Sequence, residues 1–179
     1  LLNQGRAMEA LTRFKEGLEV AISINARPLV GEIFLGMAVA YRENTQSPGW
    51  EVSRICAQNA HDLGEELGTA GLITMGLTSL ALAELRLERP DEALRLSTRA
   101  VSYLKGGKLA GVRTEEIWYN HAQVLQALGR SADAREALDR ARGLVEARAS
   151  RLNNDALADG FLSRVTLNRR IREHAAILP

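Results

Sequence analysis

Small residues return along this chain at nearly constant intervals, and this recurrence constrains the fold more than any other feature. The anchor positions are Ala10, Ser53, Ala93 and Ala134, which lie 43, 40 and 41 residues apart. Another small residue follows seven positions after each anchor, as expected where two helices approach closely. Repeats of this length are typical of stacked helical units that bury their apolar sides against one another. We therefore predict an all-α domain of stacked antiparallel helix pairs.

An apolar stripe precedes each of the three later anchors. Every stripe occupies positions i, i+3, i+4 and i+7, which form one face of a helix. The stripes are Phe34, Met37, Ala38 and Tyr41; Leu77, Leu80, Ala81 and Glu84; and Trp118, His121, Ala122 and Leu125. The small third residue lets a partner helix pack closely, and the large residues fill the space around it. Each pair thus joins a stripe helix to an anchor helix.

Stripes, anchors and turn signals together predict nine helices. Their expected ranges are 6–26, 29–44, 49–67, 70–87, 90–104, 113–127, 131–151, 155–164 and 168–176. Pro28 and Pro48 are expected between helices, whereas Pro90 suits a first turn, where its missing N–H is harmless. Thr114, followed by two glutamates, is expected to be an N-cap. The two residues 153–154 are expected to interrupt the helical run before two final helices.

Charge and composition argue against several classes of protein. Aromatic residues make up only 4% of the chain, while Leu and Ala dominate its apolar share, which favours helix over strand. The 23 basic and 22 acidic side chains nearly balance, so nothing suggests a nucleic-acid partner. No apolar run of 18 residues is present, so we expect no membrane partner. Cys56 is the only cysteine, which excludes an internal disulfide and suggests the reducing cytoplasm.

The segment from Trp118 through Gly129 and Ala134 to Ala141 resembles a tetratricopeptide repeat. Similarity to that family covers roughly residues 5–150. The resemblance implies a right-handed α-α superhelix, with about three and a half helix pairs in a single domain, 1–179, and capping helices at 155–176. Two departures are visible: the period is near 41 residues instead of 34, and Glu84 stands where an aromatic residue or Leu is usual.

Longer repeats of this kind are similar to the C-terminal helical regions of bacterial signal-transduction ATPases and cyclase-linked ATPases. The segment 161–171 resembles the tail that closes such proteins. Because the chain begins Leu-Leu-Asn without a methionine, we expect it to be a piece of a longer protein, from its C-terminal part.

No residues are spaced as a catalytic, cofactor-binding or metal site would require. His61, His121 and His174 fall in separate predicted helices, and the motifs HExxH, CxxC, GxSxG, GxGxxG and Walker A are absent. We therefore expect no enzyme activity, no metal and no cofactor. Adjacent acids such as Glu65-Glu66 and Glu115-Glu116 point about 100° apart on a helix, so we expect solvated surface charges.

Three features have both a functional and a structural interpretation. His121 is either a pH-sensitive, ligand-touching group or, as we favour, a half-buried imidazole with a hydrogen-bond partner. Cys56 is either a reactive thiol or, as we expect, a small hydrophobe on a packed helix. The basic run 164–172 suits a nucleic-acid or membrane contact, but the absence of aromatic stacking residues favours a solvated face of a capping helix.

In tetratricopeptide stacks the first helix of each pair lines a concave groove that binds ligands. The resemblance carries this role to Glu32, Leu35, Val39, Arg42, Met75, Thr78, Leu82, Leu85, Glu116, Tyr119, Gln123 and Gln126. This set is apolar in its middle and lacks the Lys/Asn/Arg clamp with which some members hold a C-terminal carboxylate. The expected ligand is an amphipathic helix or an extended peptide.

We therefore expect a non-catalytic scaffold that binds a protein or peptide, within a bacterial regulatory protein. Leu82 and Tyr119 are hypothesised to contribute to this binding. The same residues would alternatively pack against other domains of the parent chain or against a second copy. A different class of function is a sensor module that binds a signalling peptide or a small effector in the groove.

Overall fold

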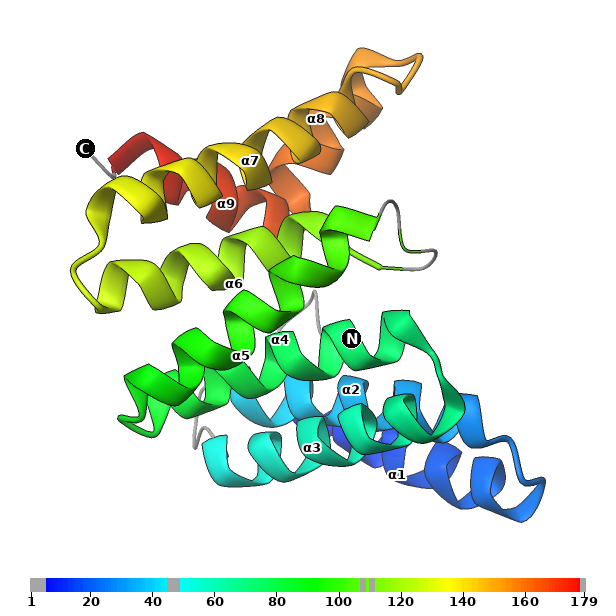
Figure 1. The fold of residues 1–179 in the computed structure, drawn as a ribbon. Helices are drawn as coiled ribbons and strands as arrows, with labels where there is room; N and C mark the ends of the chain where they lie inside the picture. Colours follow the sequence, from blue (N-terminus) through cyan, green and yellow to red (C-terminus); the bar gives the residue numbers. More distant parts are fainter. Residues whose placement is uncertain (1–5, 45–48, 107–108, 110–111, 178–179) are drawn as a thin grey trace. The chain divides into compact units, whose positions relative to one another are not determined.

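Helices form all the regular secondary structure in the part of the chain that the structure describes. The computed structural model describes residues 6–44, 49–106, 109 and 112–177, and no strand occurs among them. The helices are α1 (Ala7–Ser23), α2 (Arg27–Arg42), α3 (Trp50–Leu67), α4 (Ala70–Arg86), α5 (Pro90–Tyr103), the short 3-10 helix η2 (Leu104–Gly106), α6 (Thr114–Ala127), α7 (Ser131–Ala149), α8 (Asp155–Arg164) and α9 (Thr166–Ile177) (Figure 1). The all-α prediction is confirmed.

The chain divides into two compact units. The N-terminal unit, Leu1–Val112, contains α1 to α5, and the C-terminal unit, Arg113–Pro179, contains α6 to α9. In the N-terminal unit every helix packs against the next, and α2 also packs against α4. In the C-terminal unit α6 packs against α7, and α7, α8 and α9 pack against one another. A single repeat domain over residues 1–179 stays a prediction.

The anchor residues are buried where neighbouring helices meet. Ala10, Ser53, Ala93 and Ala134 are all buried, and so are the small residues of the three stripes, Ala38, Ala81 and Ala122. Ser53 stands where the other anchors are alanine, and its Oγ donates a hydrogen bond to the Ala38 carbonyl, 2.8 Å away. This bond satisfies a hydroxyl whose burial would otherwise destabilise the fold. The packing role predicted for the small residues is confirmed.

Two glycines let α3 and α4 touch backbone to backbone. A Cβ atom added to Gly76 of α4 would lie 2.9 Å from the Cα of His61 in α3. A Cβ added to Gly64 of α3 would lie 2.8 Å from the backbone nitrogen of Ile73 in α4. Real Cβ atoms do not come this close to backbone, so this helix pair depends on both glycines.

Four helices end in the same left-handed turn. The residue with positive φ is Asn25 after α1, Gly68 after α3, Glu88 after α4 and Gly129 after α6. In each turn the next backbone N–H donates to the carbonyl five residues back, at 2.8 to 2.9 Å, as in a Schellman motif. These bonds satisfy carbonyls that the helix ends would leave open. The turns reverse the chain within a few residues.

Glu88 is the least suited of these four residues to its backbone conformation. Its φ is +61°, a region that costs a residue with a Cβ about 1–2 kcal/mol. Glycine removes this strain but also makes the unfolded chain more flexible, which offsets part of the gain. Glu88→Gly is therefore expected to raise the free energy of unfolding by about 0.5–1 kcal/mol. Urea denaturation measures this change. Asp91→Gly, an acid-to-glycine change inside α5, is expected to lower stability; a loss of stability in Glu88→Gly would contradict the prediction.

The predictions for Pro28 and Thr114 are wrong, and several helix ends differ from the predicted ones by up to three residues, while the helices themselves lie where expected. Pro28 is not between helices but in the first turn of α2, where a missing N–H costs nothing. Thr114 is not the N-cap of α6; Arg113 is, without a side-chain capping bond. Asn154 does end the connection after α7, because its side chain accepts a hydrogen bond from the Leu157 N–H and caps α8. Pro48 lies outside the described residues.

Candidate functional site

The N-terminal unit places eight of the predicted groove residues on two helices that pack together, α2 and α4. Leu72 of α4 fills the space that a Cβ would occupy at Gly31 of α2, so the two helices meet near their first turns. Because α3 reverses the chain between them, α2 and α4 run in the same general direction. Leu35 lies one turn beyond Gly31, and Met75 lies one turn beyond Leu72.

Apolar side chains of this region differ in how far solvent reaches them. Leu35, Val39, Met75 and Leu85 are half-buried, and we call these four residues the α2–α4 face. Half-buried apolar groups retain surface that a ligand can cover.

The other four predicted residues of α2 and α4 differ more widely in their exposure to solvent. Glu32 is exposed. The side chain of Arg42 is only 8% exposed, and its Nε lies 3.9 Å from Glu43. Thr78 and Leu82 are buried, at 2% and 7% exposure, and the Thr78 hydroxyl donates to the Thr74 carbonyl at 2.8 Å. Leu82 therefore offers no free surface in this structure.

The C-terminal unit holds the remaining four predicted residues, all on α6. Glu116 is buried and forms an ion pair of 2.6 Å with Arg113. Tyr119 is half-buried, and its ring stands edge-on to that of His174 in α9, with ring centroids 5.8 Å apart. Gln123 donates to the side-chain oxygen of Asn120 at 3.2 Å, while Gln126 is exposed. Three of the four are thus already in contact with other side chains.

Several carboxylates are buried ion-pair partners, which corrects the expectation of solvated surface charges. Glu115 and Glu116 are each only 3% exposed, and Glu115 pairs with Arg148 of α7 at 2.5 Å. Glu84 is 6% exposed and accepts a hydrogen bond from Arg89 at 3.1 Å. Burial of a carboxylate is tolerated where a cation and hydrogen bonds compensate for lost hydration. Glu65 and Glu66 are exposed, as predicted.

Glu84 belongs to a charge cluster that joins three segments. Arg54 of α3 approaches it to 4.0 Å, and Glu51, one turn before Arg54, lies 3.0 Å from the Arg54 guanidinium and 3.7 Å from that of Arg89. The cluster therefore ties the start of α3 to the end of α4 and to the turn before α5. Glu84 fills the place of an aromatic residue or Leu in the stripe because it has cations on two sides.

The histidines and the cysteine fit structural roles. His121 is half-buried, and burial lowers its pKa, with the Arg130 charge acting in the same direction and Asp133 against it. Burial also lowers the pKa of His174 and raises that of the buried Cys56 thiol. A thiol held neutral in this way is a poor nucleophile, which supports the small-hydrophobe interpretation of Cys56.

His61 has neighbours that the sequence interpretation overlooked. Its Nδ1 lies 3.1 Å from an Asp62 oxygen and its Nε2 lies 3.5 Å from an oxygen of Glu65, which also binds Arg99 at 2.6 Å. The i, i+4 spacing of His61 and Glu65 is the sequence signal that would have revealed this contact. Within the described ranges, no group of three His, Cys, Asp or Glu side chains is placed to hold a metal ion.

Of the helices formed by described residues, none has both the length and the apolar character needed to cross a membrane. The exposed arginines at 164, 169, 170 and 172 lie on α8 and α9, as expected for a solvated face.

Comparison with known proteins adds no family to these observations. No protein-family model matches the chain, and no curated protein matches it.

Proposed function

We propose that the chain is a non-catalytic scaffold that binds a protein or peptide segment on the α2–α4 face. The observation that supports this most is the pairing of α2 with α4, two helices separated by a whole intervening helix. Each carries half-exposed apolar side chains, Leu35 and Val39 on one and Met75 and Leu85 on the other. Two neighbouring helices with such side chains suit a ligand that presents apolar side chains along its length.

The chemistry of the face favours an amphipathic helix or an extended apolar peptide. Met75 has a flexible thioether side chain, which adapts to ligands of different shape. Glu32, exposed one turn before Leu35 and Gly36, adds a charge beside the apolar rows. Apolar anchors supply most of the binding free energy in such complexes, and charges near the edge set orientation and specificity.

The setting that we propose follows from the resemblance to tetratricopeptide repeats of long period. In that setting the chain is the C-terminal interaction region of a bacterial regulatory protein and works in the cytoplasm. The repeating anchors, buried in α1, α3, α5 and α7 alike, support a helical-repeat scaffold of this kind.

A peptide selection tests the proposed function. Peptides are selected on the immobilised chain from a displayed random library, and the affinity of the enriched sequences is measured by fluorescence polarisation. Replacing Leu35 and Met75 together by serine is expected to weaken binding about 30-fold, because two apolar anchors at about 1 kcal/mol each are lost. Both residues are half-buried, so circular dichroism should show an intact fold.

A matched control separates the face from general surface hydrophobicity. Val52 and Ile55 of α3 are also apolar, with 41% and 50% exposure, and they lie on another helix. Serine at both positions should leave the affinity of the selected peptides unchanged. Equal loss in the two double variants, or enrichment of no peptide at all, would count against the α2–α4 face as a binding site.

A further inference from the structure

Helix α9 already covers part of the surface on which α6 was expected to bind a ligand. His174 of α9 and Tyr119 of α6 meet edge to face, with an angle of 87° between the ring planes. Tyr119 is among the residues that the sequence predicts to contact a partner. A segment of this same chain therefore covers Tyr119, one of the four α6 positions that were expected to contact an external ligand.

Few residues of α9 face the rest of the C-terminal unit, and they recur at regular intervals. Its buried residues are Asn168, Ile171 and Ala175, which recur at intervals of three and four. The arginines at 169, 170 and 172 point outwards and are exposed. Anchors at i, i+3 and i+7 on a helix whose exposed side carries arginines are the pattern of a ligand that lies in a groove between helices.

Helix α8 connects α7 to α9 and packs against both, but with half-buried instead of fully buried side chains. No residue of α8 is buried, and Leu157 is 64% exposed. The side-chain amide of Asn168 donates to the Phe161 carbonyl at 2.9 Å, which fixes the turn between the two helices. Attachment of α9 to α6 and α7 thus depends mainly on Ile171, His174 and Ala175. Segments that bury few apolar side chains open at low free-energy cost.

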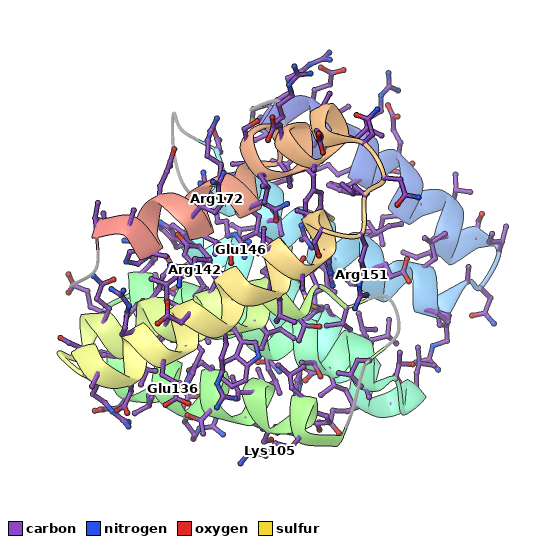
Figure 2. All side chains as sticks on the ribbon, turned by 90° about the horizontal axis from the view of Figure 1, so that it is seen from above. Lys105, Glu136, Arg142, Glu146, Arg151 and Arg172 are labelled. Atoms are coloured by element: carbon purple, nitrogen blue, oxygen red, sulfur yellow. The ribbon has the colours of Figure 1, made fainter. Side chains whose placement is uncertain are left out.

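Charged side chains lie along the border between α7 and α9. Figure 2 shows Arg142 and Glu146 on α7 and Arg172 on the neighbouring α9, all near the line where the two ribbons meet. Arg142 pairs with Glu146 at 3.8 Å and with Asp139 at 3.1 Å on α7 itself. Arg142, Asp139 and Glu146 pair with one another on α7, so separation of the two helices leaves these three charges compensated.

We propose that α9 is a displaceable internal occupant of the α6–α7 surface, and that the partner which replaces it is an amphipathic helix of another protein. This partner carries a branched apolar residue, an aromatic ring and a small residue at the positions that match Ile171, His174 and Ala175. The inference rests on the proposed scaffold function and adds its partner class and its regulation. The apparent affinity for the partner equals the intrinsic affinity multiplied by the fraction of molecules in which α9 is undocked.

The test uses the full chain and a labelled synthetic peptide of residues 155–177 as the probe. Ile171 is fully buried, so Ile171→Asp places a charge in the contact and should release α9. The variant is expected to bind the peptide at least about tenfold more tightly than the wild-type chain, whose surface is occupied. A second change, Tyr119→Ala, in the released variant should remove most of this gain. Hydrogen exchange should show α6 and α7 equally protected in all three proteins.

Other results would overturn the inference. Equal peptide binding by the wild-type chain and Ile171→Asp would show that α9 does not compete for this surface. Loss of amide protection throughout α6 and α7 in Ile171→Asp would show that α9 is an integral part of the fold. The peptides selected on the α2–α4 face, measured on the same variant, keep the two proposals apart, because they should bind Ile171→Asp and the wild-type chain alike.

Discussion

Gly76→Ala is expected to lower the free energy of unfolding by about 1–3 kcal/mol, the range typical of overpacked cores. Alanine is otherwise better than glycine in a helix by about 1 kcal/mol, so the loss must come from packing. The added methyl group would stand 2.9 Å from the Cα, Cβ and backbone nitrogen of His61. Backbone atoms cannot rotate away, so α3 and α4 must separate along their contact. Thermal and urea denaturation measure the effect.

Gly143→Ala is the matched control for this change. Gly143 lies on the exposed side of α7, and no atom lies within 4 Å of the position of its missing Cβ. Only helix propensity acts there, so the substitution should raise stability by about 0.5–1 kcal/mol. The two glycine-to-alanine changes are therefore expected to have opposite signs. If both variants were stabilised, the close approach of α3 and α4 would be refuted.

Much of the fold could be predicted from the sequence because its signals are local. Apolar spacing of 3.6 residues and small residues at Ala10, Ser53, Ala93 and Ala134 identify the helices and their packed sides. The helix ends were harder to predict. The first helix was predicted to run to residue 26, yet α1 ends at Ser23, because Asn25 adopts the left-handed conformation. Asparagine allows that conformation without requiring it.

More of the predicted groove residues are buried on α4 than on α2. Motif positions assign a direction to a side chain but not the amount of protein around it. The segment 70–83 contains no charged residue, and of its members from Leu72 onwards only Met75 is not buried. A helix that is apolar on all sides is typically buried on all sides. This composition was the available sign that Thr78 and Leu82 would be poor ligand contacts.

Two of the buried carboxylates, Glu115 and Glu84, were missed because each has a partner that is distant in the sequence. Arg148 follows Glu115 by 33 positions and lies on another helix. Arg54 precedes Glu84 by 30 positions. A spacing rule for helix surfaces reaches only three or four residues, so a single sequence shows such acids as unpaired. The outward position predicted for Glu65 and Glu66 was correct, although both also pair with distant arginines, Arg99 and Arg27.

Removing both cations near Glu84 is expected to destabilise the chain by about 3 kcal/mol, because a buried carboxylate then lacks compensation. The double variant is Arg54→Met with Arg89→Met, which keeps the aliphatic bulk of both side chains. Glu84 has a side-chain exposure of only 8%, whereas those of Arg54 and Arg89 are 30% and 53%. The loss of stability therefore comes from the Glu84 carboxylate, which cannot reach water without opening the contact of α3 with α4. Urea denaturation at neutral pH gives the value.

Adding Glu84→Leu to the double variant should restore most of the lost stability, because an apolar side chain in this place needs no cation. The backbone carbonyl of residue 84 still accepts the Arg89 N–H bond of 2.9 Å that closes the turn, so the backbone geometry persists. As a control, Glu92→Leu with Arg95→Met removes an exposed pair on α5 and should change stability by less than about 1 kcal/mol. Rescue by leucine would show that Glu84 replaces an apolar stripe residue at the expense of requiring two arginines, whereas failure of rescue would show that the arginines stabilise α3 and α4 through contacts other than the carboxylate.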